Sequence, residues 1–471
     1  MKDIRTLFHR ALLTAMLLLF LCATPRVCPA IQYPYALPGS MSATLNVNLA
    51  KKTNFNNLLL GLNCSWPENQ YGSAGYNHAD AQRLMVALRP SSLRYPHGVW
   101  ANFYDWEVDG RRIYDEYSGT YFSAVTKWPN LRYGFPRFTT LHSNLNFDVL
   151  FTWNICYDSP AKGVARLRDQ DAKGFNTKWI ELGNENFWGN QCSLAVNTIE
   201  KFVAVAKAHA DALHAAKPGL KLSVPVADKH YKKIWNAALQ TQNFYDAVSL
   251  HVYVMPGTNG VKQVLDAKNE ILNEARWVRQ IFPGKPIWLS EWAVKSGDDA
   301  ISVLGMSDVY LGFFEHPELF QICSYFQMNE HCPLILYNRT NHTHAKTSFG
   351  AAYEVIRNIF ENSEIYESRI NSSRITQGVE AVSAKAVIKN GRLAVFAINK
   401  TTNSIPLTLN FSGLVYTQGF SHRALVFADV NDFRKNYGLA DNPLTSIAPV
   451  NGRIMLPPLS LSQIDGLNQG Q

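Results

Sequence analysis

The stretch Trp179–Glu185, which reads Trp-Ile-Glu-Leu-Gly-Asn-Glu, places a carboxylate directly after a short apolar run. A second stretch, Pro286–Trp292, reads Pro-Ile-Trp-Leu-Ser-Glu-Trp and repeats this arrangement around Glu291. Acidic residues are rarely buried without a partner or a chemical role. If both runs are strands of one barrel, their carboxyl ends meet on the face that carries catalysis. The two stretches therefore predict a working pair of glutamates, Glu185 and Glu291.

The segment from residue 55 to residue 362 alternates strand-like runs with helical stretches. The clearest helical stretch is Ser193–Lys217, where apolar residues recur at helical spacing and Pro218-Gly219 ends the pattern. Val261–Ile281 is a second. Eight strands alternating with helices predict an α/β fold, a (β/α)8 TIM barrel. The predicted strands are Leu58–Asn63, Ser92–Tyr95, Asp148–Ile155, Trp179–Gly183, Lys221–Val226, Ala247–Tyr253, Ile287–Glu291 and Phe320–Phe326.

After a last helix near Thr347–Asn362 the chain changes character, because short strand-like runs now follow one another with turn residues between them. This pattern predicts a C-terminal all-β sandwich. Ala43–Leu49 also alternates, so we expect it to join the sandwich as an N-terminal strand. The predicted domains are a signal peptide (1–30), the N-terminal sandwich strand (31–52), the catalytic barrel (53–362) and the sandwich (363–471). The predicted sandwich strands are Ala384–Ile388, Leu393–Asn399, Ile405–Asn410, Ala424–Ala428 and Leu459–Ile464.

The N-terminus has the pattern of a secretory signal peptide, with basic residues before the apolar run Ala11–Ala23 and a cleavage site expected after Ala30 or after Ala23. That run is short for a membrane span, so we expect a secreted or periplasmic protein without stable membrane insertion. The formal net charge is +8, but no Lys/Arg run resembles a nucleic-acid patch. The expected partner is an oligo- or polysaccharide substrate, and the sequence leaves the oligomeric state open.

Cysteine usage argues against a metal centre. Cleavage after Ala30 leaves the five cysteines Cys64, Cys156, Cys192, Cys323 and Cys332, which are too few for a disulfide scaffold. No CxxC or HExxH spacing is present, so the sequence predicts no metal and no cofactor. Cys156 and Cys192 are expected to follow neighbouring strands and are the first candidate disulfide pair, which the sequence alone leaves open.

Polar side chains gather at the predicted strand ends, where a purely structural barrel would need none. We expect one carboxyl to hold a proton as the general acid and the other to stay ionised as the nucleophile, stabilised by hydrogen-bond donors. Arg94 and Tyr253 are the candidate donors, and Asn184 is a candidate ligand for the substrate 2-hydroxyl. The predicted substrate-binding residues are Arg94, Asn154, Asn184, His251, Tyr253, Trp292 and Gln327.

Structural alternatives stand beside these roles. Glu181 lies in the same run as Glu185 and fits equally a buried partner for a barrel arginine. His251 fits a structural role as well as a binding role. Trp292 fits either an aromatic platform for a sugar ring or ordinary packing, and the 12% aromatic content fits either explanation.

The chain resembles the clan A retaining glycoside hydrolases, and within that clan it is most similar to the family 51 α-L-arabinofuranosidases and the heparanase-like family 79 group. The resemblance rests on Leu93–Trp106, Trp179–Glu185, His251–Tyr253 and the helix Val303–His316. It implies that Glu185 is the acid/base and Glu291 the nucleophile. The family usually shows Gly-Gly after Pro96, where this chain has His97-Gly98.

These observations predict a secreted, metal-independent retaining glycoside hydrolase that acts on plant- or matrix-type polysaccharides by double displacement and is arabinofuranosidase-like. A β-glucuronidase/heparanase-like or xylosidase-like hydrolase is the alternative within the same class. A catalytically silent carbohydrate-binding protein is the alternative from another class. The sugar, its linkage and endo or exo action stay open.

Overall fold

A computed structural model describes residues 32–467 except 65, 67–70, 72–74, 112–132, 189–190, 192–194, 230–232, 257–259, 295–296, 330–331, 413, 417–419 and 451–452. The predicted signal peptide and Cys192, half of the proposed disulfide, lie outside the described residues.

The barrel and the sheet belong to one compact unit, Pro34–Gln471. The expected boundary near residue 363 therefore separates two architectures within this unit. No helix among the described residues is long and apolar enough to cross a bilayer.

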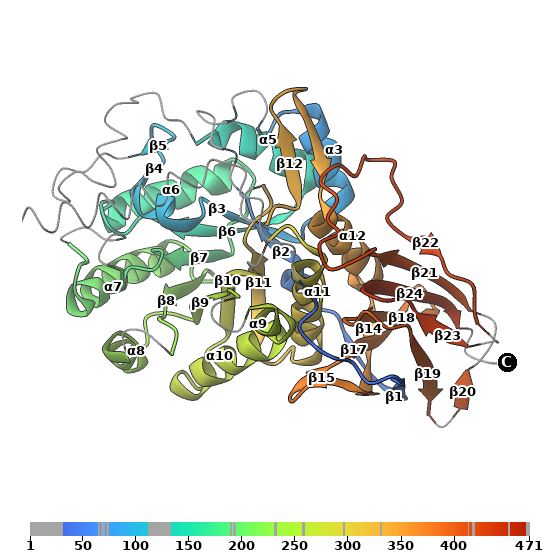
Figure 1. The fold of residues 1–471 in the computed structure, drawn as a ribbon. Helices are drawn as coiled ribbons and strands as arrows, with labels where there is room; N and C mark the ends of the chain where they lie inside the picture. Colours follow the sequence, from blue (N-terminus) through green and yellow to red (C-terminus); the bar gives the residue numbers. More distant parts are fainter. Residues whose placement is uncertain are drawn as a thin grey trace, which may run out of the picture. The chain divides into compact units, whose positions relative to one another are not determined.

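Eight parallel strands close into a barrel in the order β10-β11-β2-β3-β6-β7-β8-β9 (Figure 1). Each corresponds to one of the eight runs predicted from the sequence, and the (β/α)8 fold is confirmed. The barrel strands are β2 (Gly61–Asn63), β3 (Ser92–Tyr95), β6 (Asp148–Trp153), β7 (Trp179–Leu182), β8 (Lys221–Pro225), β9 (Ala247–Val254), β10 (Ile287–Val294) and β11 (Phe320–Tyr325).

The helices between these strands differ from the predictions mainly at their ends. The helix predicted from Ser193 begins at Ile199, because the Thr198 side chain caps it by accepting from the Lys201 amide. The stretch Val261–Ile281 is two helices, broken at Asp266. The helices are η2 (Asn57–Leu60), α3 (Ala79–Leu88), η4 (Gly98–Phe103), α5 (Phe135–Leu145), α6 (Pro160–Ala172), α7 (Ile199–Ala216), α8 (Lys233–Gln240), α9 (Val261–Leu265), α10 (Ala267–Ile281), α11 (Ala300–Glu315) and α12 (Ser348–Phe360).

The C-terminal part is all β, as predicted, and forms a ten-stranded sheet in which nine strands follow the order β20-β19-β1-β14-β17-β18-β24-β21-β22 and β23 pairs with β19 off this path. The N-terminal strand β1 lies inside this sheet, where Leu45 pairs with Ile370 of antiparallel β14 and with Leu409 of parallel β19. The expectation for this strand is therefore confirmed. The sheet strands are β1 (Ala43–Asn54), β14 (Glu364–Ser372), β17 (Val382–Lys389), β18 (Arg392–Asn399), β19 (Ile405–Phe411), β20 (Leu414–Tyr416), β21 (Ser421–Val426), β22 (Thr445–Ser446), β23 (Ile454–Leu456) and β24 (Ser460–Leu467).

Three short hairpins complete the described fold: β4 (Tyr104–Asp105) with β5 (Gly110–Arg111), β12 (Ile335–Asn338) with β13 (Thr343–Lys346), and β15 (Arg374–Thr376) with β16 (Val379–Glu380).

Helices α11 and α12 join the barrel to the sheet (Figure 1). Every residue of α11 from Ala300 to Phe314 is buried, as expected for a helix covered on all sides. Phe360 of α12 meets Phe396 of β18 at 5.8 Å between ring centroids, and Lys400 pairs with the buried Asp308 of α11 at 2.5 Å. Ring packing and a buried ion pair therefore connect the barrel helices to the sheet.

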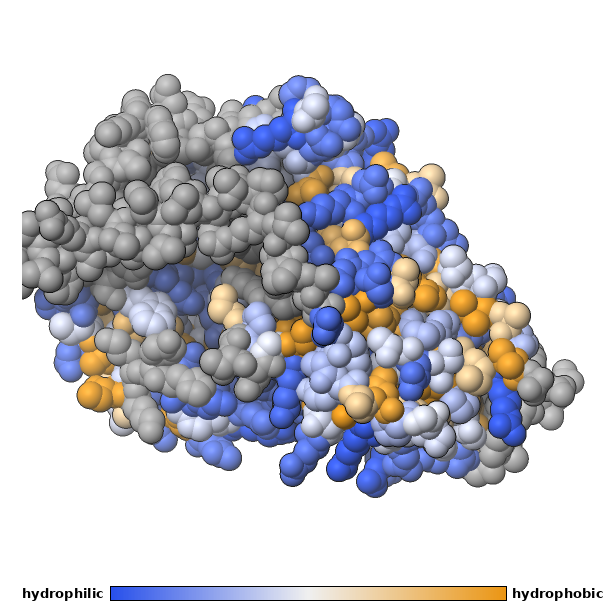
Figure 2. Space-filling model, viewed as in Figure 1, coloured by the Kyte–Doolittle hydropathy of each residue, from blue (hydrophilic) through white to orange (hydrophobic). Residues whose placement is uncertain are grey.

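The face of the molecule in Figure 2 mixes hydrophilic and hydrophobic residues. Exposed large apolar side chains such as Val86 on α3, Ile234 on α8 and Met255 after β9 belong to separate elements. Scattered single apolar residues are normal on a soluble surface.

Candidate active site

The carboxyl ends of β3, β7, β9 and β10 bring together most of the residues predicted to act on substrate. Arg94, Asn184, His251 and Tyr253 all contact a glutamate of this end or a neighbour that does. Parallel barrel strands end on the same face, so residues far apart in the chain meet here.

Glu291 lies at the centre, with 3% of its surface exposed. The Arg94 guanidinium donates to its Oε1 at 2.5 Å, and the Tyr253 hydroxyl donates to its Oε2. Burial and the charge of Glu291 raise the pKa of Tyr253 well above its usual value, so the phenol keeps its proton and remains a donor. Both oxygens of this buried carboxyl therefore accept a hydrogen bond from a fixed donor.

Arg94 organises the surrounding carboxylates. It is fully buried and donates to Glu181 Oε2 at 2.6 Å and to Asn184 Oδ1 at 2.7 Å, as well as to Glu291. Burial alone would lower the pKa of Arg94, but the charges of Glu181 and Glu291 outweigh it and raise that pKa. The hypothesis that Glu181 is a buried partner for a barrel arginine is confirmed, and that arginine is Arg94.

The turn after β7 holds Glu185 in an unusual backbone conformation. Glu185 has φ of 44°, in the left-handed region that non-glycine residues rarely adopt. Gly183 has φ of 86°, and a Cβ there would lie 2.1 Å from Asn186 Oδ1. The Asn184 amide donates to Asn102 Oδ1 at 2.9 Å, which fixes the turn between the two. Backbone strain of this kind persists where the surroundings over-determine it, commonly at functional sites.

Both oxygens of Glu185 have partners. His251 Nδ1 lies 2.8 Å from Oε1, and the Gln191 side-chain amide donates to Oε2. His251 Nε2 lies 3.1 Å from Ser290 Oγ, and this hydroxyl donates to Glu181 Oε1 at 2.7 Å. These bonds fix the imidazole between Glu181 and Glu185.

The pKa values of His251 and Glu185 differ from the expectation drawn from the sequence. Burial would lower the pKa of His251, but Glu291, Glu181 and Glu185 together raise it to about 10. Burial would raise the pKa of Glu185, but the hydrogen bonds from His251 and Gln191 outweigh burial and hold that pKa below its usual value. The expected raised pKa of Glu185 is therefore not met in the free site. These directions favour an ionised Glu185 beside a protonated His251, whose Nδ1 faces Glu185 Oε1.

The two predicted catalytic glutamates are close together. One oxygen each of Glu185 and Glu291, together with a ring nitrogen of His251, lie within 4.8 Å of one another. These three groups are near enough to hold a metal ion, but metal ligands must be deprotonated and the raised pKa of His251 opposes that. Arg94 already occupies Glu291 Oε1. The donor set suits acid–base chemistry better than metal binding.

Trp292 corrects one prediction. Its ring is fully buried and packs edge-on against Tyr310 and Phe313 of α11 at 4.8 and 5.0 Å between centroids. Successive residues of a strand point to opposite faces, so Glu291 faces the barrel end while Trp292 faces the helix. Trp292 is a packing residue, and the prediction that it binds substrate is wrong.

Two other predicted residues, Asn154 and Gln327, lie just after β6 and β11. The Asn154 amide donates to the Tyr104 carbonyl at 3.1 Å and accepts from the Cys156 amide at 3.1 Å, so it shapes the turn after β6. Gln327 is buried directly after β11. Its predicted role in substrate binding stays a prediction.

His97, where the chain departs from the family pattern, is buried and packs edge-on against Phe326 at 5.4 Å. Phe326 in turn meets the Tyr253 ring at 5.6 Å. The following Gly98 has φ of 61°, and a Cβ there would lie 3.9 Å from Glu291 Oε1. The side chain at 97 therefore supports the ring that serves the nucleophile.

Four residues of the site were not predicted from the sequence: Asn63, Asn102, Gln191 and Ser290. Asn63 ends the first barrel strand and accepts from Arg94 at 3.2 Å, so a complete reading of strand ends would have found it. Ser290 directly precedes Glu291. Asn102 and Gln191 lie in a 3-10 helix and a loop, where no local pattern marks a functional position.

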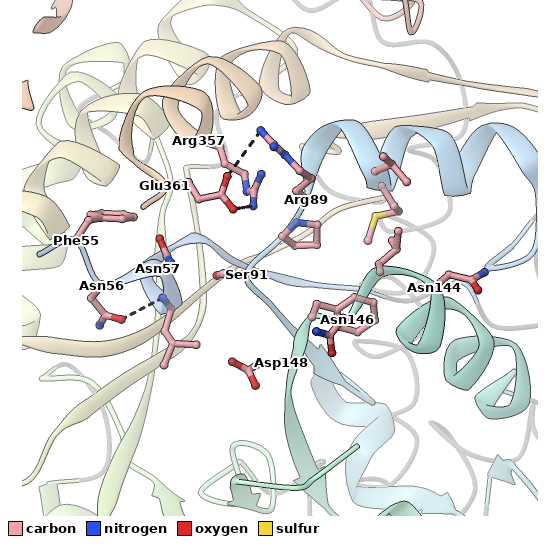
Figure 3. A pocket seen from close by; sticks show the side chains of 16 residues that line it. Phe55, Asn56, Asn57, Arg89, Ser91, Asn144, Asn146, Asp148, Arg357 and Glu361 are labelled. Atoms are coloured by element: carbon pink, nitrogen blue, oxygen red, sulfur yellow. Dashed lines mark hydrogen bonds and ion pairs between the residues drawn. The ribbon is translucent and has the colours of Figure 1, made fainter. Parts of the chain in front are cut away.

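A cavity of about 640 Å³ lies at the opposite end of the barrel (Figure 3). Its lining includes Ser91 and Asp148 at the starts of strands, and Arg89, Arg357 and Glu361 at the ends of α3 and α12. Figure 3 shows the ion pairs of Glu361 with both arginines at its edge. In barrels this end serves stability, and none of the predicted site residues line it, so we do not assign it to the chemistry.

Comparisons with protein-family models and with curated protein sequences give no match. Solved structures match the fold. The family 51 arabinofuranosidase from Xanthomonas axonopodis pv. citri has a TM-score of 0.72 at 15% identity and covers 91% of this chain and 100% of its own. The thermostable family 51 α-L-arabinofuranosidase from Thermotoga petrophila RKU-1 has a TM-score of 0.73 at 16% identity, covering 90% and 100%. A family 44 xyloglucanase from Paenibacillus polymyxa has a TM-score of 0.63 at 13% identity, covering 91% and 100%.

The chain has the fold of the clan A glycoside hydrolases, as the motifs predicted. Within this fold it is more similar to the family 51 arabinofuranosidases than to the family 44 xyloglucanase, with TM-scores of 0.72 and 0.73 against 0.63.

Proposed function

We propose that the protein is a retaining glycoside hydrolase with Glu291 as nucleophile and Glu185 as acid/base. The observation that carries this proposal is the separation of the two carboxyls, whose nearest oxygens lie within 4.8 Å. Retaining enzymes hold their carboxyls about 5–5.5 Å apart, whereas inverting enzymes need room for a water between them. The different surroundings of the two groups also fit two different roles.

In the first step Glu291 attacks the anomeric carbon while the bond from that carbon to the leaving oxygen breaks. The leaving oxygen takes a proton from Glu185. For this step Glu185 takes up a proton from solvent on the oxygen that faces the leaving group, while Oε1 keeps its hydrogen bond to His251 Nδ1 at 2.8 Å. Tyr253 and Arg94 hold Glu291 in position for attack.

In the second step water attacks the anomeric carbon and displaces Glu291 from the glycosyl ester. Glu185, now ionised, takes the proton from that water. Each step inverts the carbon once, so the product keeps the configuration of the substrate. The low pKa of Glu185 in the free site suits this base role.

For the substrate we propose a neutral sugar, with an α-L-arabinofuranoside as the first candidate. The family 51 structures named above are arabinofuranosidases, and their fold is the one this chain shares. A uronide would need a cation for its carboxylate. Both cations of the described cluster, Arg94 and His251, are already engaged by glutamates. Secretion after cleavage behind Ala30 is part of the same proposal.

The test is hydrolysis of a nitrophenyl glycoside panel by wild type, Glu291→Ala and Glu185→Ala. We expect cleavage of the arabinofuranoside and a loss of about 10⁴-fold or more in kcat for Glu291→Ala, as for residues that act as one catalytic unit. Product analysis by NMR should show retained configuration at early times. An inverted product would overturn the mechanism.

The rival from another class is a silent carbohydrate-binding protein. It is supported if wild type cleaves no glycoside or polysaccharide of the panel but still binds one of them by calorimetry. Activity that survives in both glutamate variants would instead place the chemistry elsewhere.

A further inference from the structure

Gln191 is held in place by the residues around the predicted acid/base. The Asn102 side-chain amide donates to the Gln191 backbone carbonyl at 2.7 Å, and the Gln191 backbone N–H donates to the Trp188 carbonyl at 3.0 Å. The Asn184 side-chain amide donates to Gln191 Oε1 at 2.6 Å. With Oε1 held by Asn184, the nitrogen Nε2 is turned to Glu185 Oε2 and donates to it.

The same two asparagines also fix the turn that carries Glu185. Asn102 accepts from the Asn184 backbone amide at 2.9 Å and donates to the Asn184 carbonyl at 2.6 Å. Asn184 itself accepts from Arg94. Gln191 is therefore tied to the strained turn and, through Arg94, to Glu291.

The two oxygens of Glu185 differ in how firmly they are held. Oε1 faces His251, a 5% exposed cation that is fixed on its other side by Ser290. Oε2 faces the neutral side-chain amide of Gln191, which is half-buried. A leaving-group oxygen can replace a neutral amide more readily than a buried cation. Oε2 is thus the oxygen available to the leaving group.

We propose that Gln191 is the positioning residue for the acid/base carboxylate, holding Glu185 Oε2 where the oxygen of the leaving group is later bound. This inference rests on the proposed function and adds a residue to it. Between turnovers the amide keeps Glu185 in the rotamer that protonates the leaving group. A donor on Oε2 also favours the ionised form, which the second step needs as its base.

The proposal predicts a dependence on the leaving group. A poor leaving group needs a proton from Glu185, whereas dinitrophenolate departs without one. Gln191→Ala should lower kcat/KM about 10- to 100-fold for a glycoside with an alkyl or sugar leaving group, the range for a hydrogen bond to a charged group. For the dinitrophenyl glycoside the loss should stay below about threefold.

Gln191→Glu is the matched variant, because it keeps the size of the side chain and the acceptor for Asn184, and it replaces the donor to Glu185 with a carboxylate that repels it. We expect it to lose at least as much as Gln191→Ala with the poor leaving group. Gln242→Ala, a part-buried glutamine that bonds to the Ala238 carbonyl and Thr241, is the control and should resemble wild type. Equal losses for both leaving groups, or wild-type activity in Gln191→Glu, would overturn the proposal.

A second readout does not need activity. Carbon-13 NMR of the Glu185 carboxyl, assigned with Glu185→Gln, should show an upward shift of its pKa in Gln191→Ala relative to wild type. If wild type cleaves no glycoside, the proposed function fails, and this titration still decides the contact. An unchanged titration in Gln191→Ala refutes the positioning role even if the enzyme is active.

Discussion

The two ends of the barrel use the same residue types in opposite proportions. At the carboxyl ends of the strands, Arg94 and His251 face three glutamates, and the charges of Glu181 and Glu291 raise the pKa of Arg94. At the other end, Arg89 and Arg357 share Glu361, and burial, with Arg89 nearby, lowers the pKa of Arg357. An excess of buried carboxylates therefore marks the chemical end.

Exposure separates the Arg94–Glu291 pair from the Arg89–Glu361 pair as well. The Arg94 and Glu291 side chains are 0% and 5% exposed, whereas Arg89 and Glu361 are 50% and 18% exposed. Charges in contact with water interact weakly, while buried charges interact strongly and shift one another's pKa values. Ion pairs at helix C-termini also follow the helix dipole, which needs no catalytic explanation. The candidate active site is therefore identified by its buried carboxylates and not by the size of a cavity.

The largest expected effect tests the catalytic end. Arg94→Met leaves Glu181 and Glu291 buried without their cation, which typically costs about 3–5 kcal/mol in the free energy of unfolding. We also expect kcat to fall about 100- to 1,000-fold, because the nucleophile loses a fixed donor. Urea unfolding and glycoside kinetics measure the two effects. A variant with wild-type stability would show that the buried cluster is not coupled as the contacts indicate.

An intermediate effect concerns pH. The pKa of His251 is raised to about 10 in the folded protein, so the native state binds a proton that the unfolded state has lost above about 6.5. The stability from this group is complete below pH 6.5 and declines as pH rises through 10, at about 1.4 kcal/mol per pKa unit. His251→Asn should flatten this decline.

Urea unfolding at pH 6, 8 and 9.5 measures that slope in both proteins. The difference between wild type and variant isolates His251 from the tyrosines and lysines that titrate in both. If the difference in stability stays constant with pH, His251 is neutral in the native state, and the contrast in charge between the two ends disappears.

The smallest effect tests the other end. Arg89→Met removes a half-exposed cation that lies 3.7 Å from Glu361, and surface pairs of this kind contribute about 0–1 kcal/mol. We expect unchanged kcat/KM and a change in unfolding free energy within that range. A large loss of activity would mean that the cavity in Figure 3 communicates with the chemistry.

The architecture was predictable because its signals are local. Each barrel strand is a short apolar run between polar segments, so the positions of β3 and β7 follow directly from the pattern. The break at Asp266 and the late start of α7 were not predictable to the residue, because caps decide helix ends.

The site was predictable only where it coincides with strand ends. Glu185, Glu291, Arg94 and Tyr253 follow from that rule, and Trp292 shows its limit, since adjacent residues of a strand face opposite sides. The Gln191 side-chain amide donates to Glu185, six residues away in the sequence, and this contact exists only in the folded chain. Its neighbours in the sequence carry no signal for such a role.

The place of β1 has a consequence for how the chain becomes folded. The Asn410 side chain donates to Asn46 across a sequence separation of 364 residues, and β1 lies between β14 and β19 in the finished sheet. Such non-local pairing makes folding slow, because the first strand must wait for partners made near the end of synthesis. Until then the strand has open edges and apolar residues such as Leu45 and Val47. In a nascent chain this apolar strand therefore stays unpaired until the strands near the C-terminal end have been made.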